Sequence, residues 1–229
     1  MKYKDFEDAF SIERIKRYII ACEGNKQNAM KLYRNNLRLS QEIFTLINCF
    51  EVTLRNRIDR QMTIHFGNDW LRDLILPHGA FWNNHAVETT RKIIENAYQG
   101  LLRDGNYSHS KLLSEMEFGV WKYMFSNVQY RLTGRVLLDA FPMKPTSSAQ
   151  HQYDNVYIFH ELDYINHIRN RIAHHEPICF GRSALIDTTY ALNRYALMIK
   201  LLKWMDIDAA GMLYGLDHIN FYCDKIMKI

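Results

Sequence analysis

The chain has 229 residues, of which 48% are hydrophobic and 24% charged. This balance is typical of a globular protein with a proper core and argues against a disordered chain. The formal net charge of +4 permits contact with a polyanion such as RNA but does not require it, because nucleic-acid-binding domains often carry a stronger positive bias.

Helices are expected along most of the chain, because proline and glycine number only 4 and 10 and all-β folds need more turn residues. The first is predicted to begin at Ser11 and to stop at Gly24-Asn25, and Ser40 is expected to cap the longest one. Apolar residues spaced by three and four predict further helices. The predicted helices cover 11–24, the neighbourhood of 29–33, 40–66, 86–102, a stretch following 118, 154–173, 183–205 and 213–227.

These elements predict an all-α fold. Residues 70–85 are expected to be irregular, and 141–152 to form a loop that is the only candidate linker. Because this loop is short, 1–229 is predicted to be a single domain.

The compartment and the absence of cofactors are inferred from what the sequence lacks. No segment approaches the roughly 20 apolar residues of a membrane span, and the charged first ten residues lead into no apolar signal segment, so we expect a cytoplasmic protein without a membrane partner. The four cysteines are far apart and form no CxxC pair, which argues against a structural zinc site and a disulfide scaffold. We expect neither a metal nor a cofactor.

The helix ahead of Pro177 carries the most informative residues. It must end at or before Glu176, because the residue before a proline is pushed out of the α region. Its apolar stripe comprises Ile158, Leu162, Ile165, Ile168 and Ile172. Beside this stripe, Asn166, Asn170 and His174 form a polar row at i, i+4 and i+8.

Arg169 does not belong to that polar row. Its Cα lies about 140° around an ideal helix from His174. The two side chains could meet through the reach of the arginine, through fraying near Pro177, or across a dimer with a second copy of the segment. We favour the dimer.

These residue types suit the cleavage of an RNA phosphodiester by its own 2′-OH. Arg169 could neutralise phosphate oxygens with a planar fork of donors, His174 could move a proton, and Asn170 could orient either one. No metal is needed if the arginine stabilises the developing charge. The alternative is a polar flank on an exposed helix, because an Arg, an Asn and a His this close are common by chance.

The run Arg169–Ile178 closely resembles the signature of the abortive-infection-like (Abi-like) family of the HEPN superfamily, which is marked by an arginine, a polar residue and a histidine a few positions on. Three other segments resemble the family in the expected order, so that the resemblance covers most of the chain. Phe50–Asn56 resembles its upstream helix, Phe118–Trp121 its middle element, and Phe141-Pro142 its later loop.

This resemblance implies a HEPN-like helical bundle built around a four-helix core, with metal-independent endoribonuclease activity. It also implies a homodimer in which the two Arg/His motifs meet in one cleft. The biological setting would be antiphage abortive infection or toxin–antitoxin control, with RNA as substrate and an antitoxin, protein or RNA, as a possible partner. A non-catalytic RNA-binding or protein-interaction HEPN module of a defence complex is the alternative, and the intact motif favours the enzyme.

Carried over by position, Arg169, Asn170 and His174 match the catalytic motif. His175 and Glu176 fit the family pattern but could equally shape the helix end. Glu51 and Arg55 match the upstream helix and are candidate supporting residues. Because they stand at i and i+4, an ion pair facing solvent is their alternative interpretation.

The stretch Trp121–Arg135 is both basic and aromatic, and it could contact RNA by charge and stacking. The plainer interpretation places its aromatic residues in the core and its cations on a solvated face.

Overall fold

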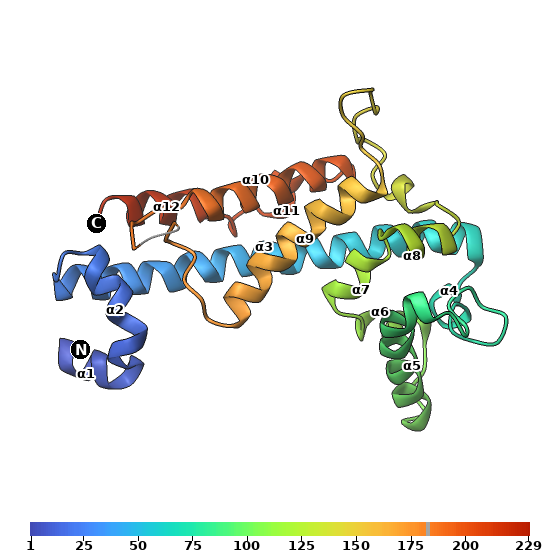
Figure 1. The fold of residues 1–229 in the computed structure, drawn as a ribbon, viewed down its shortest axis with the longest axis horizontal. Helices are drawn as coiled ribbons and strands as arrows, with labels where there is room; N and C mark the ends of the chain where they lie inside the picture. Colours follow the sequence, from blue (N-terminus) through green and yellow to red (C-terminus); the bar gives the residue numbers. More distant parts are fainter. Residues whose placement is uncertain (182–183) are drawn as a thin grey trace. The chain divides into compact units, whose positions relative to one another are not determined.

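The computed structural model describes residues 1–181 and 184–229, and its regular structure is helical (Figure 1). Within these residues the only extended pairing is a single antiparallel bridge between Phe180 and Ile186. The predicted all-α class is therefore confirmed. No helix of the described part is long and apolar enough to cross a membrane.

The chain divides into two compact units. Unit 1 comprises 1–49, 167–200 and 208–229, and unit 2 comprises 50–166 and 201–207. Three helices contribute residues to both units, namely α3 (Lys26–Phe66), α9 (Asn155–Ala173) and α10 (Thr189–Trp204). The other helices of unit 1 are α1 (Tyr3–Phe10), α2 (Ile12–Ala21), α11 (Ala209–Met212) and α12 (Ile219–Met227). Those of unit 2 are α4 (Trp70–Asp73), η1 (His85–Val87), α5 (Glu88–Arg103), α6 (His109–Ser114), α7 (Phe118–Tyr123), α8 (Asn127–Leu132) and η2 (Leu137–Ala140). The single domain expected from the sequence stays a prediction.

Helix α3 corrects the prediction of a helix start at Ser40. The helix runs without a break from Lys26 to Phe66, because this stretch contains no glycine or proline that would end it. Its N-terminus is instead capped by Asn25, whose Oδ1 accepts hydrogen bonds from the backbone of Gln27 and Asn28. The helix ends where predicted, at Gly67, whose φ of 88° is easiest for glycine.

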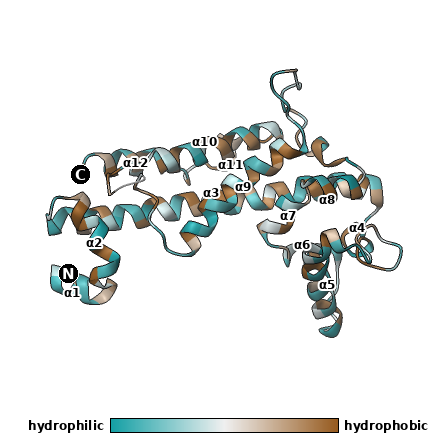
Figure 2. Cartoon of the chain, viewed as in Figure 1, coloured by the Kyte–Doolittle hydropathy of each residue, from teal (hydrophilic) through white to brown (hydrophobic). Residues whose placement is uncertain are grey.

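One face of α3 is buried along most of the helix. The residues of this face that are completely or almost completely buried are Leu39, Ile43, Leu46, Ile47, Phe50, Leu54, Ile58 and Met62. Their spacing of three and four is that of a helix with one apolar stripe. Figure 2 shows the same alternation of hydrophobic and hydrophilic residues along α3.

Several other predicted boundaries also need correction. Helix α1 was not predicted, and the expected irregular stretch 70–85 contains the short helix α4 and the start of η1. The last predicted helix starts at Ile219 instead of residue 213. The predicted start at Ser183 lies outside the described residues, and α10 begins at Thr189.

Helix α9 agrees with its prediction. It ends at Ala173, ahead of Pro177, and Ile158, Leu162, Ile165 and Ile168 are completely buried. Ile172, the last residue of the predicted stripe, is only partly buried. The motif thus stands at the end of a helix whose inner face is held in the core.

Candidate functional site

The residues Arg169 to His174, called the motif below, are followed by a tight turn that ends α9. The backbone N–H of His175 donates to the carbonyl of Ile172, and that of Glu176 donates to the carbonyl of Arg171 at 2.7 Å. His175 is left-handed, with a φ of 59°. These two bonds and the left-handed residue make a Schellman motif, with His174 as the last residue of the helical turn.

Arg171 holds this turn from the last turn of α9. Its Nη2 donates to the carbonyl of Pro177 at 2.6 Å, and its Nε donates to Glu176 Oε2 at 3.2 Å. Its guanidinium also lies 4.8 Å from the centre of the Tyr190 ring on α10, a cation–π distance. The segment that follows His174 is thereby tied back to the helix.

Two residues from distant parts of unit 1 complete the support. Arg14 on α2 donates a hydrogen bond to the carbonyl of His175. Asn36 on α3, which is 4% exposed, accepts a hydrogen bond from the backbone of Ile178 at 2.9 Å. The turn is therefore fixed by three helices, so that His174 projects from a well-held backbone.

Arg169 and Asn170 lie on the last two turns of α9. Nη1 of Arg169 lies 3.4 Å from Oδ1 of Asn170, which is long for a hydrogen bond. His174 is exposed, and its side chain has no hydrogen-bond or ion-pair partner within 1–181 and 184–229. No hydrogen bond joins Arg169 to His174 among these residues. Within one chain, the structure thus brings Arg169 to Asn170 but not to His174.

The neighbouring candidates His175 and Glu176 take part in the turn itself. His175 supplies the left-handed residue and the carbonyl that Arg14 contacts. Glu176 supplies the carboxylate that Arg171 contacts. Glu176 thus takes part in the turn through its side chain, whereas His175 takes part through its backbone.

The candidates from the upstream helix, Glu51 and Arg55, lie on the part of α3 that belongs to unit 2. Both are partly buried. Nε of Arg55 is buried without a hydrogen-bond partner in the described structure. The role of these two residues stays a prediction.

A shallow cavity of about 350 Å³ lies beside the motif in unit 1. Residues of α3 and the end of α9 form its lining, which comprises Asn36, Leu37, Ser40, Gln41, Phe44, Ile172, Ala173, His175 and Glu176. Leu37 and Phe44 are 45% and 39% exposed. An apolar surface thus adjoins the backbone that carries His174.

The basic and aromatic stretch of unit 2 follows its plainer interpretation only in part. Trp121 is completely buried and Tyr130 nearly so, but Tyr123 is 47% exposed. Among the cations, Lys122 is buried and its Nζ lies 2.8 Å from Asp163 Oδ1. Arg131 and Arg135 are exposed, and they line a polar cavity of about 410 Å³.

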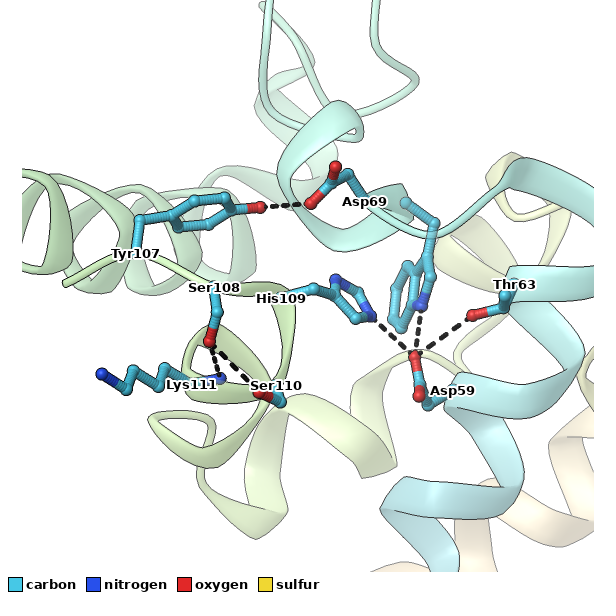
Figure 3. Close-up of polar contacts among 9 residues, drawn as sticks. Asp59, Thr63, Asp69, Tyr107, Ser108, His109, Ser110 and Lys111 are labelled. Carbon is cyan, nitrogen blue, oxygen red and sulfur yellow. Dashed lines mark hydrogen bonds and ion pairs between the residues drawn. The ribbon is translucent and has the colours of Figure 1, made fainter.

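A polar cluster in unit 2 could not be anticipated from the sequence. Oδ1 of Asp59 on α3 accepts hydrogen bonds from Nε1 of Trp70 and Nε2 of His109, both at 2.8 Å, and lies 3.5 Å from the hydroxyl of Thr63 (Figure 3). Nδ1 of His109 is buried and unpartnered within the described chain. Because no substrate can reach this nitrogen, the cluster serves as an internal tie between α3, α4 and α6.

Among the described residues, no three His, Cys, Asp or Glu side chains are placed to hold a metal ion. None of the four cysteines forms a disulfide. Burial raises the pKa of the Cys179 thiol, which lies just past the motif, to about 12, so it is a neutral thiol and a poor nucleophile near neutral pH.

Sequence reasoning missed the residues that hold the turn. Arg171 lies inside the motif, and a cation in the last helical turn is a known signal for contact with the final carbonyls. Arg14 and Asn36 gave no signal, because each is more than a hundred residues from its partner.

A family model described as "Abi-like protein" matches residues 3–179 of the chain. The match includes the motif and most of both units. No curated protein and no solved structure shows significant similarity to the chain.

Proposed function

The chain belongs to the Abi-like protein family, which suggests a role in abortive infection, and from this premise we propose that it is a metal-independent endoribonuclease of an antiphage or toxin–antitoxin system. The observation that carries the proposal is the placement of Arg169, Asn170 and His174 at a helix end whose backbone three helices hold in place. A backbone held in this way limits where these side chains can lie, which suits a site that stabilises charge developing on phosphate oxygens.

In the proposed reaction the 2′-OH of a ribose attacks the adjacent phosphorus. The bond between the 2′-oxygen and phosphorus forms, and the bond to the 5′-oxygen breaks. One group accepts the proton of the 2′-OH, and another donates a proton to the leaving 5′-oxygen. His174 is assigned to proton transfer, Arg169 to stabilising the charged phosphorane, and Asn170 to orienting them. The products are a 2′,3′-cyclic phosphate and a 5′-OH.

A homodimer supplies what one chain lacks. Arg169 and His174 make no contact within one chain, so a second copy would bring a further arginine and histidine to the same phosphate. The two histidines could then act as the base and the acid. The exposed Leu37 and Phe44 beside the motif offer apolar area for such an interface. A closed two-fold assembly would use the same patch on both copies.

The exposed arginines Arg131 and Arg135 offer a second surface with RNA-binding chemistry. Guanidinium groups pair with phosphates by charge-assisted hydrogen bonds, and the cavity that they line is mainly polar. We assign this surface to contact with the RNA backbone, which adds affinity without selecting sequence.

The experiment is cleavage of single-stranded RNA in EDTA, with analysis of the product ends. We expect cyclic phosphate ends, and we expect His174→Ala to lower the rate by about 10²–10⁴. Arg169→Ala should lower it by about 10²–10³, and Arg169→Lys should not restore it, because an ammonium lacks the planar fork. Both side chains lie outside the buried stripe of α9, so circular dichroism should show that the variants fold.

A matched control shows whether the loss of any histidine of α9 slows cleavage or only the loss of His174. His167→Ala removes an exposed histidine of the same helix that is outside the proposed triad, and it should leave cleavage largely intact. If unmodified protein binds RNA without cutting it, the enzyme proposal fails. If EDTA abolishes cutting, the metal-independent mechanism fails. Binding without cleavage would favour the non-catalytic module of a defence complex, which acts through a partner such as an antitoxin.

A further inference from the structure

Unit 2 contains a cavity that the proposed function does not use. Its volume is about 490 Å³, which is within the range of small-molecule sites. It lies where η1, α5, α7 and α8 come together. Apolar side chains supply much of its lining, namely Val87, Ile93, Val120 and Tyr123.

A buried amide in this lining has an unused acceptor. Gln129 on α8 is 4% exposed, and its Nε2 donates to Oγ1 of Thr90 on α5 at 2.7 Å. Its Oε1 is buried and has no hydrogen-bond partner among the described residues. Buried polar atoms are nearly always paired, so this carbonyl oxygen is suited to receive a donor from a molecule in the cavity.

The charged residues of the lining are acidic. Glu88, Glu115 and Glu117 all contribute to it. Glu88 is paired with Lys92, with 2.6 Å between Oε1 and Nζ. Glu115 and Glu117 are exposed and form no ion pair within the described part of the chain. The one basic residue of the lining is His85, whose Nδ1 lies 4.0 Å from Glu88 Oε2. The glutamates Glu115 and Glu117 therefore leave an excess of negative charge, which favours a cation.

We propose that this cavity binds a small organic cation that has an apolar body and a terminal ammonium or guanidinium group. That group donates to Oε1 of Gln129, and the alkyl or aromatic body lies against the apolar lining. A second positive charge is stabilised by Glu115 and Glu117. An effector site of this kind would be separate from the motif residues, which belong to unit 1.

The glycine of the Phe118–Trp121 segment provides a sharp test. Gly119 lines the cavity, and a Cβ placed on it would meet nothing within 4 Å. Gly119→Leu should therefore fill the cavity without a clash. Gly100→Leu is the matched control, because Gly100 is also a helical glycine with open space at Cβ but is not part of the lining.

The experiment is isothermal titration of the full chain with agmatine, which carries a guanidinium and an ammonium on a butyl chain. We expect saturable binding at one site per chain, unchanged in Gly100→Leu and absent in Gly119→Leu. The double variant Glu115→Gln/Glu117→Gln should bind about tenfold more weakly, because it loses two exposed charge contacts. The side chain of Glu117 makes no capping bond, so its neutralisation should not disturb α7.

The comparison ligand is 4-guanidinobutanoate, which replaces the ammonium by a carboxylate. It should bind more weakly than agmatine, because its carboxylate is repelled by the acidic lining. The proposal is overturned if agmatine gives no saturable binding, if folded Gly119→Leu binds it as well as the unmodified chain, or if the two ligands bind equally. If Gly119→Leu fails to fold, the glutamate double variant decides, and unchanged affinity there overturns the proposal.

Discussion

Replacing Asp59 by alanine should destabilise unit 2 strongly, because one carboxylate oxygen accepts two short hydrogen bonds. Its partners are the indole nitrogen of Trp70, a residue that is 1% exposed, and the ring of His109. A hydrogen bond to a charged group contributes about 1.5–3 kcal/mol. The Asp59 side chain is 28% exposed, so solvent lowers this contribution, and we expect a loss of about 2–4 kcal/mol in the free energy of unfolding.

The variant Asp59→Asn separates the contribution of the negative charge from the contribution of the hydrogen bonds themselves. Asp59→Asn keeps an acceptor oxygen in place but makes both hydrogen bonds neutral, and neutral bonds contribute about 0.5–1.5 kcal/mol each. We therefore expect Asp59→Asn to lose about half as much stability as Asp59→Ala. The comparison is informative because Asp59→Asn keeps an acceptor oxygen, whereas Asp59→Ala removes the whole carboxyl group.

The stability contributed by Asp59 should depend on pH. Burial acts to raise the pKa of this carboxyl, but the hydrogen bonds from His109 and Trp70 outweigh it, and the pKa is lowered from its ordinary value. A lowered pKa in the folded state means that the contribution is complete above the ordinary pKa of about 3.9. It is lost as the pH falls through the lowered value.

The assay is urea unfolding of the three proteins followed by far-UV circular dichroism at neutral pH and at several acidic pH values. The gap between the unmodified chain and Asp59→Ala should shrink below about pH 4. A gap under about 0.5 kcal/mol at neutral pH, the size of an ordinary surface substitution, would refute the role given to this cluster.

The remaining predictions concern the motif turn and the RNA surface. His175→Gly should raise the free energy of unfolding by about 0.5–1 kcal/mol, because glycine adopts the left-handed conformation without a Cβ penalty; thermal unfolding measures this, and a lower stability would contradict it. Arg171→Ala should cost about 1–3 kcal/mol in chemical unfolding through its lost hydrogen bonds to Pro177 and Glu176, and an unchanged stability would show that the turn does not depend on it. Replacing both Arg131 and Arg135 by alanine should weaken RNA binding and reduce the salt dependence of log K by about 2, as measured by fluorescence anisotropy, whereas an unchanged slope would exclude contact with phosphates.

The helical class and the end of α9 could be predicted because their signals are local. Scarce glycine and proline, apolar residues at three and four spacing, and Pro177 after the motif all act within a few residues. The predicted helix start at Ser40 was wrong because it rested on a single local signal. A serine is a good N-cap, but nothing near it breaks the helix, and the buried face of α3 continues on both sides.

The support of the site could not be predicted, because it depends on contacts between distant segments. The bonds from Arg14 to His175 and from Ile178 to Asn36 join residues that only the tertiary fold brings together. The same is true of Asp59 and His109, and of Gln129 and Thr90. A single sequence shows which residues could do chemistry, but not which of them a folded backbone holds in place.

The most direct test of the proposed dimeric ribonuclease is to mix two inactive variants, Arg169→Ala and His174→Ala. In a mixed dimer one chain supplies the arginine and the other the histidine, so a site shared between two copies regains one group of each kind. We predict that each variant alone cuts RNA poorly in EDTA and that the refolded mixture cuts faster than either variant and leaves cyclic phosphate ends. Full activity of His174→Ala alone would contradict the account. A mixture that contains mixed dimers but is as inactive as each variant would also contradict it.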